Sequence, residues 1–203
     1  SRTTAATLAR LPNGVGLYIL GTSCDLFFLA AAKERMLMLD QKERASKVDA
    51  IIVGAGFSGL YLLHRLRGLG FTTRVFERGD GVGGTWYWNR YPGARCDVES
   101  MQYSYSFDEE LQQEWRWPEK FSAQPDILAY AEHVAERFDL TKDIDFETEV
   151  TAACFDEGTR RWKIETDNGE KVDAQHFIMA TGCISTAQTP GINGLSEYRG
   201  NTY

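Results

Sequence analysis

The chain has 203 residues, of which 43% are hydrophobic and 25% are charged, a balance typical of a globular protein with one or two domains. Its formal net charge of -7 gives it no attraction for a phosphate backbone, so nucleic acid is not an expected partner. The cysteines at positions 24, 96, 154 and 183 match neither a zinc-binding pattern nor a disulfide framework. We therefore expect reduced thiols, no metal site and a cytoplasmic location.

Residues 1–47 precede the organised part of the sequence. They include an apolar stretch at 15–32, whose 18 residues are barely enough to span a bilayer. Asp25 lies near the middle of that stretch, where its carboxylate would cost about 2.5–3.5 kcal/mol on insertion scales. We favour a family-variable or non-native, disordered extension over a membrane or export segment, with a natural start at Met36 or Met38.

The organised sequence begins with the order of a βαβ unit. Residues 48–53 (VDAIIV) form a short apolar run typical of a buried parallel strand. From Ser58 to Leu69 the apolar residues follow helical spacing, and two glycines end that helix. Residues 72–77 (TTRVFE) predict a second strand. This order predicts an α/β fold with a parallel sheet.

The rest of the chain predicts a loop, a helix and three strands. Residues 79–95 are rich in Gly, Trp, Tyr and Pro and indicate a long ordered loop, and Pro125 opens a helix that reaches Phe138. The strand-like runs are residues 144–155, 161–166 and 171–180. Asp167-Asn168-Gly169 is a turn signal between the last two. We expect a doubly wound parallel sheet with a small antiparallel β layer made by these runs.

The turn after the first strand has the spacing G-x-G-x-x-G, with glycines at 54, 56 and 59 in the run GAGFSG. The first glycine allows a tight turn, the second lets the backbone approach a pyrophosphate, and the third lets helix and strand pack closely. Free N–H groups at the helix N-terminus favour a bound phosphate. Because the turn follows a strand and opens a helix, Gly54, Gly56 and Gly59 indicate a dinucleotide-binding site.

Glu77 ends the second strand, where the dinucleotide motif requires an acidic residue. Its carboxylate can accept hydrogen bonds from ribose hydroxyls and would repel a 2′-phosphate, so the site favours FAD or NAD over NADP. The alternative is a solvated charge at a strand end, beside Arg78.

Residues 83–100 read GGTWYWNRYPGARCDVES, an aromatic run in a loop that also contains Gly and Pro. This run resembles type I Baeyer–Villiger flavin monooxygenases, most closely the branch of phenylacetone and steroid monooxygenases. The resemblance extends over residues 48–203. It continues through YSYSF (103–107), EWRW (114–117), AQPDILAY (123–130), RFDL (137–140) and ATG (180–182).

The resemblance implies that the glycine turn binds FAD. Ser58 and Glu77 would hold the pyrophosphate and ribose, Val150 would meet the adenine, and residues 85–88 would wall in the isoalloxazine. Core packing is the ordinary explanation for such aromatic residues. The cofactor-binding residues predicted in full are Gly54, Gly56, Ser58, Gly59, Glu77, Gly84, Thr85, Trp86, Tyr87, Trp88, Arg95, Asp97, Tyr103 and Val150.

Arg95 and Asp97 are implied to have a second role, because in the family they would also face bound NADP. The aspartate that matches Asp97 orients an active-site arginine, which is expected beyond residue 203; a structural ion pair is the alternative. The site for NADPH, the second expected cofactor, would also lie mostly beyond that residue.

We expect a FAD-binding domain at residues 48–185 and the start of a linker to an NADPH-binding domain at 186–203. The family's linker fingerprint is F-x-G-x-x-x-H-x-x-x-W, against which Tyr198 replaces the Phe and Gly200 fits. The His would be the next residue, so we expect a chain truncated before its NADPH domain and inactive alone.

The activity that the resemblance implies is an NADPH- and O₂-dependent conversion of a ketone to an ester or lactone through a flavin peroxide. Two alternatives stay open, a flavin-containing monooxygenase that oxygenates N or S and a non-catalytic FAD-binding module. The aromatic run weighs against the first, and an end within a linker motif weighs against the second. A membrane partner is not expected, and His64, His133 and His176 are interpreted as surface or packing residues.

Overall fold

The computed structural model describes residues 7–10, 16–19 and 46–202, and the chain divides into two compact units, Ser1–Ser46 and Lys47–Tyr203. In the first unit, β1 (Thr7–Arg10) and β2 (Gly16–Ile19) pair in antiparallel fashion. The rest of the apolar stretch at 15–32 lies outside the described residues, as do Met36 and Met38. Over the described residues, no helix has both the length and the apolar character that crossing a membrane requires.

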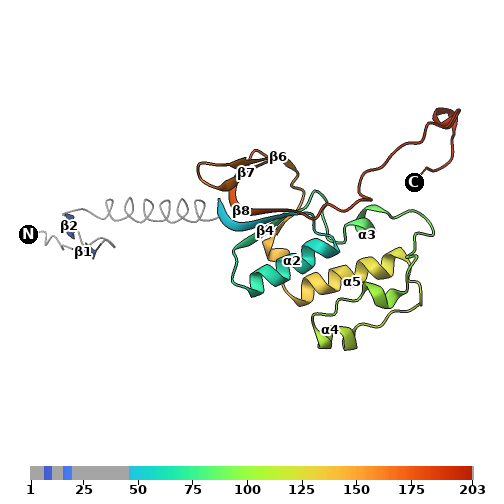
Figure 1. Cartoon of the computed structure of the whole chain (residues 1–203), viewed down its shortest axis with the longest axis horizontal. Helices are drawn as coiled ribbons and strands as arrows, with labels where there is room; N and C mark the ends of the chain where they lie inside the picture. Colours follow the sequence, from blue (N-terminus) through green and yellow to red (C-terminus); the bar gives the residue numbers. More distant parts are fainter. Residues whose placement is uncertain (1–6, 11–15, 20–45, 203) are drawn as a thin grey trace, which may run out of the picture. The chain divides into compact units, whose positions relative to one another are not determined.

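The second unit is built on one mixed sheet with the strand order β5-β4-β3-β8-β7-β6 (Figure 1). Its strands in chain order are β3 (Lys47–Val53), β4 (Thr73–Phe76), β5 (Ile144–Asp145), β6 (Val150–Asp156), β7 (Arg161–Thr166) and β8 (Lys171–Met179). Strands β5, β4, β3 and β8 are parallel, whereas β7 and β6 continue the sheet in antiparallel fashion. Val53 lies opposite Phe76 on one side and Met179 on the other, so three parallel strands end at one level.

This architecture confirms the predicted α/β class with a Rossmann-like parallel core. The antiparallel strands differ in one respect from the expectation. They do not form a separate layer, because β8 pairs with β3 along one edge and with β7 along the other. The parallel and antiparallel parts are therefore halves of a single sheet.

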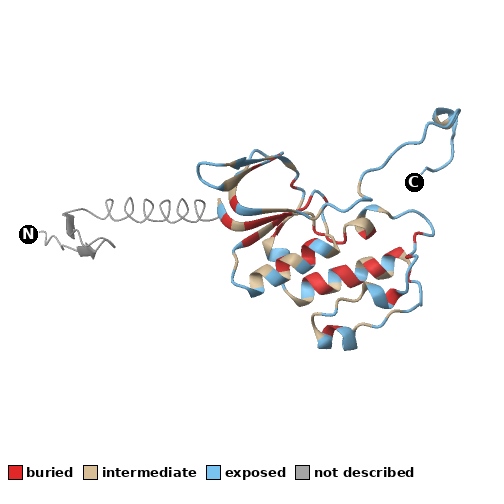
Figure 2. Cartoon of the chain, in the orientation of Figure 1, coloured by how far each residue is buried: buried red, intermediate tan, exposed pale blue. Residues whose placement is uncertain are grey.

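Helices α2 (Phe57–Gly68) and α5 (Gln124–Arg137) lie together on one face of the sheet (Figure 1). Their buried sides carry apolar residues at helical spacing, shown in red in Figure 2. Strands and helices share one core cluster, to which they contribute Ile52, Leu60, Leu63, Val75, Ala131 and Ala135. Successive strand residues point to opposite faces, so Ile51 belongs to a second cluster, with Phe76 and Ile164.

The predicted strand at 144–155 is wrong as a single element. It forms β5 and β6, which lie at opposite edges of the sheet. Between them the chain crosses the carboxyl end of β4: the N–H of Glu147 donates to the carbonyl of Gly79 at 3.0 Å, and that of Thr148 to the carbonyl of Glu77 at 2.9 Å. Glu147 has a positive φ of 51°, which breaks the strand although no Gly or Pro marks the site.

Two short α-helices were not predicted. α3 (Thr85–Trp88) lies within the expected loop at 79–95, and α4 (Glu109–Glu114) follows the YSYSF segment. α4 has an N-cap in Asp108, whose Oδ1 accepts from the N–H of Leu111 at 2.7 Å. Both helices are too short for hydrophobic periodicity to reveal them.

Candidate functional site

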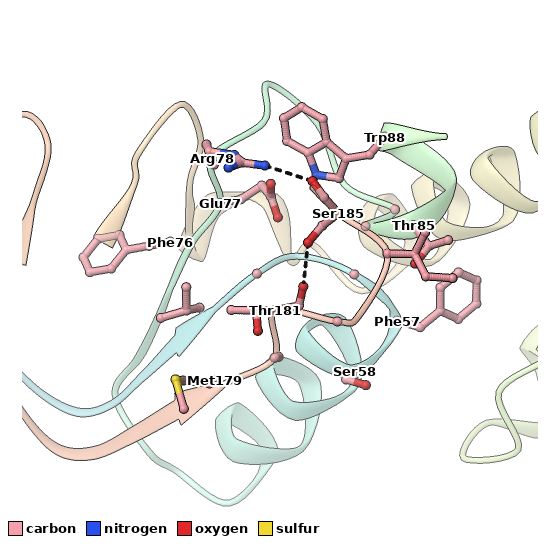
Figure 3. A pocket seen from close by; sticks show the side chains of 18 of the residues that line it. Phe57, Ser58, Phe76, Glu77, Arg78, Thr85, Trp88, Met179, Thr181 and Ser185 are labelled. Atoms are coloured by element: carbon pink, nitrogen blue, oxygen red, sulfur yellow. Dashed lines mark hydrogen bonds between the residues drawn. The ribbon is translucent and has the colours of Figure 1, made fainter. Parts of the chain in front are cut away.

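A cavity of about 720 Å³ opens at the carboxyl ends of β3, β4 and β8 (Figure 3). Val53, Phe76 and Met179, the last residues of these strands, all line it. Ligands of open α/β sheets bind at this edge, since the loops that follow the strands surround it. The volume falls within the range of small-molecule pockets, roughly 300–1,000 Å³.

The turn between β3 and α2 forms one side of the cavity, which we call the backbone wall (residues 54–59). Gly54 has a φ of +103°, and a Cβ there would lie 2.7 Å from the carbonyl oxygen of Ala180. A Cβ on Gly59 would lie 1.9 Å from the carbonyl oxygen of Gly54. Real Cβ atoms do not approach so closely, which agrees with the close helix–strand packing predicted for the third glycine.

The second glycine has a different neighbour. A Cβ on Gly56 would lie 3.3 Å from the Cα of Gly84, and a Cβ on Gly84, whose φ is +55°, would lie 2.8 Å from the Cα of Gly56. Both glycines line the cavity, so two backbone segments meet here with no side chain between them. Gly56 is the N-cap of α2 and supplies no side-chain cap, and Phe57 and Ser58 of the first turn also line the cavity. Bare backbone at a helix N-terminus suits a phosphate group.

Glu77 is buried beside this wall, with a relative exposure of 5%. Its Oε2 accepts from the N–H of Ala55 at 2.7 Å, and its Oε1 accepts from the N–H of Gly79 at 2.8 Å. These contacts exclude the alternative of a solvated strand-end charge. Each carboxylate oxygen has a second lone pair, so Glu77 can still accept hydrogen bonds from a ligand in the cavity that it lines.

The crossover between β5 and β6 borders the cavity next to Glu77. Thr148, Glu149 and Val150 all line it. The hydrogen bond from the N–H of Thr148 to the carbonyl of Glu77 holds the crossover next to the acidic residue. The structure therefore brings Val150 and Glu77, which are far apart in sequence, to one end of the cavity.

Trp86, Trp88 and Tyr103 also line the cavity, and we call these three residues the aromatic wall. Trp86 is buried and meets Tyr103 edge to face, with ring centroids 5.5 Å apart. Gln124 of α5 helps to hold this wall in place, because its Nε2 donates to the carbonyl of Trp86 at 2.5 Å. Burial raises the pKa of Tyr103, and the nearby side chains of Cys96 and Asp97 add to the effect.

The segment that follows β8, residues 180–186, also borders the cavity. Arg78 Nη2 donates to the carbonyl of Ser185 at 3.2 Å, and the Arg78 guanidinium lies 4.8 Å from the ring centre of Trp88 (Figure 3). Asn89 Nδ2 donates to the carbonyl of Ile184 at 3.0 Å. Thr181, the middle residue of the ATG segment, also lines the cavity.

Four predicted site residues do not line the cavity: Gly59, Tyr87, Arg95 and Asp97. Gly59 acts through packing. Tyr87 points away from Trp86, because successive residues of a helical turn diverge by about 100°, and its hydroxyl donates to Asp80 Oδ1 at 2.5 Å. Arg95 pairs with the carboxylate of Glu119, and Asp97 is exposed.

The other predicted site residues line the cavity together, namely Gly54, Gly56, Ser58, Glu77, Gly84, Thr85, Trp86, Trp88, Tyr103 and Val150. The sequence interpretation missed Phe57, Arg78 and the segment 184–186, which also line it. Phe57 could have been found, because it stands inside the glycine motif. The closing segment carries no sequence signal.

Comparison with known proteins identifies relatives of this unit. Residues 52–116 match a family described as NAD(P)-binding Rossmann-like domain. A phenazine N-monooxygenase of Lysobacter antibioticus is 44% identical over 153 residues, which are 75% of this chain and 28% of the relative. An acetone monooxygenase (methyl acetate-forming) of Gordonia sp. (strain TY-5) is also 44% identical, over 75% of this chain and 29% of the relative.

Solved structures show the same similarity. An oxidized steroid monooxygenase bound to NADP has a TM-score of 0.71 and 57% identity, over 74% of this chain and 29% of that one. A cyclohexanone monooxygenase from Rhodococcus sp. Phi1 bound to NADP⁺ has a TM-score of 0.72 and 44% identity, over 76% of this chain and 29% of that one. The chain thus spans less than a third of the length of the relatives it matches.

Proposed function

Because the homologues of this chain are Baeyer–Villiger and other flavin monooxygenases, we propose that it is the FAD-binding part of an NADPH- and O₂-dependent monooxygenase that converts ketones to esters or lactones. The observation that carries the proposal is the cavity at the carboxyl ends of three parallel strands, which is lined by the glycine turn, by Glu77 and by the aromatic wall. We propose a FAD-binding domain at residues 48–185 and the start of a linker at 186–203.

The cavity fits FAD in three ways. Gly56 and Gly84 let two backbone segments lie in contact beside the cavity, where both can reach a diphosphate, and a Cβ at either position would push the segments apart. Glu77 has free lone pairs for the ribose hydroxyls. The rings of Trp86 and Tyr103 offer an apolar surface for a flat ring system. FAD would therefore lie with its adenosine near Glu77 and Val150 and its flavin near the aromatic wall.

When bound, FAD supplies the redox and oxygen chemistry, and the chain supplies binding, orientation and protection from water. The N-terminal turn of α2 would hold the diphosphate through backbone N–H groups. Trp86 and Tyr103 would exclude water from one side of the flavin. Asp97, exposed and close enough to Tyr103 to affect its pKa, is proposed to orient an arginine supplied by another part of the protein.

Arg95 and Asp97 are proposed to face NADPH. Both lie outside the FAD cavity and both are exposed, which supports contact with a second ligand or domain. We further propose that the whole protein works in the cytoplasm, where NADPH is available.

The test is NADPH consumption by the full-length protein with O₂ and a panel of ketones. The proposal expects bound FAD, ketone-stimulated NADPH oxidation, and one ester or lactone formed per NADPH consumed. NADPH oxidation that yields only reduced oxygen species, with every ketone recovered unchanged, would contradict the ketone assignment.

A second candidate reaction is N-oxygenation of an aromatic heterocycle. The observation that favours it is the relative named a phenazine N-monooxygenase, which is as similar to this chain as the acetone monooxygenase. Addition of a phenazine to the same assay distinguishes the two, because an N-oxide product supports this candidate and a lactone supports the first.

A further inference from the structure

Phe57 has an unusual position in the glycine turn. It lines the cavity, and its side chain also packs against three separate hydrophobic clusters. Its ring centroid lies 5.6 Å from that of Tyr103, 5.5 Å from that of Tyr105 and 6.1 Å from that of Tyr130. The first residue of α2 is thus the point where the phosphate-binding turn meets the aromatic core.

The hydroxyl of Tyr105, a partly buried residue, also holds the backbone of Phe57. The hydroxyl of Tyr105 donates to the carbonyl oxygen of Phe57 at 2.5 Å. The backbone N–H of Tyr105 donates in turn to the hydroxyl of Tyr130 at 2.8 Å, and Tyr130 is buried in α5. Two hydrogen bonds therefore connect the middle of α5 with the first turn of α2, whose N-cap, Gly56, supplies no side-chain cap.

The hydroxyl of Tyr105 is protonated at neutral pH. Burial raises the pKa of Tyr105 far above its usual value, and the neighbouring Tyr130 adds to the effect. The hydroxyl therefore keeps its proton and remains a donor at neutral pH. The aromatic contacts of the ring would survive loss of that hydroxyl, since a phenylalanine fills almost the same space.

We propose that Tyr105 is a positioning residue for the cofactor: its hydroxyl holds the Phe57 carbonyl, and so keeps the N–H groups of the first turn of α2 arranged for the diphosphate of FAD. This inference rests on the proposed FAD-binding function. Binding is tighter when the site is already ordered, because less conformational freedom is lost with the ligand. A loosened turn would weaken affinity for the diphosphate and leave contacts to the rest of the ligand unchanged.

The test compares Tyr105→Phe with Tyr61→Phe in the full-length protein, at a temperature where both variants and the wild type are folded. Tyr61 is a matched control, because its ring stacks on that of Tyr105 at 6.3 Å but is 40% exposed. FAD is titrated directly, and ADP and adenosine are measured as competitors. ADP retains the diphosphate, whereas adenosine lacks it.

For Tyr105→Phe we expect the Kd of FAD to rise about 3- to 10-fold, the range of one hydrogen bond. The Kd of ADP should rise by the same factor, and that of adenosine should not change. Tyr61→Phe should leave all three within about twofold. Unchanged FAD and ADP affinity, or an equal loss for adenosine, would overturn the inference, because a purely structural role cannot select for the diphosphate.

If Tyr105→Phe does not fold, Tyr130→Phe replaces it, since this variant removes the acceptor of the Tyr105 N–H. It must show the same selective loss with a smaller factor, and equal affinity for FAD and ADP in variant and wild type would overturn the inference. Failure of wild-type protein to bind FAD is a separate outcome, which removes the proposed function and this inference together.

Discussion

On the backbone wall, Gly54, Gly56 and Gly59 contribute main chain alone, and neighbouring main-chain atoms determine which residue can stand at each position. On the aromatic wall, Trp86 and Tyr103 contribute side chains, and the site depends on the direction in which each ring points. In the backbone wall an added methyl group would clash at Gly54 and Gly59 and would make a tight contact at Gly56. In the aromatic wall, neighbours in sequence face different surroundings.

The two walls differ for a physical reason. A phosphate needs several N–H groups within hydrogen-bonding distance, which only a closely approaching backbone provides. A flat ring system needs apolar area, which many arrangements of side chains can provide. Substitutions in the backbone wall should therefore have large and specific effects, whereas effects in the aromatic region should depend on which way the side chain points.

The largest effect is expected for Gly59→Ala. Its Cβ would overlap the carbonyl oxygen of Gly54 at 1.9 Å, so α2 must move away from β3. We expect the free energy of unfolding to fall by about 3 kcal/mol or more, measured by denaturant titration. Gly68→Ala, in the same helix with no atom within 4 Å of the added Cβ, is the control and should change stability by at most about 1 kcal/mol. Similar stability of the two variants would contradict the packing role of Gly59.

Gly56→Ala should affect binding more than folding. Its Cβ would lie 3.3 Å from the Cα of Gly84, a tight contact that small shifts relieve, but those shifts would displace the backbone that is proposed to hold a phosphate. We expect the Kd of FAD to rise at least about 100-fold, or about 2.7 kcal/mol, by titration with FAD. Near-normal affinity for FAD would mean that its phosphate does not bind beside Gly56.

Glu77→Gln should have an intermediate effect. A glutamine can offer one carbonyl oxygen to Ala55 or Gly79 but presents an NH₂ group to the other N–H donor. We expect a loss of about 1–3 kcal/mol in the free energy of unfolding and a rise of about tenfold in the Kd of FAD. Repulsion of a 2′-phosphate should also fall, which competition between NAD and NADP measures. Unchanged competition would mean that Glu77 does not reach the ribose.

The smallest effect is expected for Tyr87→Phe. The hydroxyl that it removes bonds to Asp80 outside the cavity, so we expect a loss of about 0.5–1 kcal/mol in stability and a change of less than about twofold in the Kd of FAD. Thermal unfolding and FAD titration measure the two quantities. A tenfold loss of FAD affinity would instead mean that Tyr87 contacts the cofactor, as the sequence predicts.

The backbone wall could be predicted from sequence because its constraints are local. Gly54, Gly56 and Gly59 lie between a strand and a helix that hydrophobic periodicity reveals, and Glu77 follows the next strand. Its burial between two N–H donors could not be predicted, since it depends on how the turns after β3 and β4 fold together.

The aromatic region could be predicted only as a set of residues. The run at 83–100 predicts Trp86 and Tyr87 equally as site residues. Only the fold shows that Trp86 faces the cavity and Tyr87 faces Asp80. The crossover at Thr148 and the link from Tyr105 to Phe57 join segments distant in sequence, and no local pattern encodes such contacts.

The most direct test of the account is to identify which dinucleotide the cavity prefers. Purified full-length protein is titrated with FAD, NAD and NADP, and the binding of each is compared in Gly56→Ala and Gly68→Ala. The account predicts one FAD per chain, bound more tightly than NAD, with NADP weakest at this site because of Glu77, and loss of FAD binding in Gly56→Ala alone. Preference for NAD or NADP at the glycine turn, or FAD binding that survives Gly56→Ala, would contradict it.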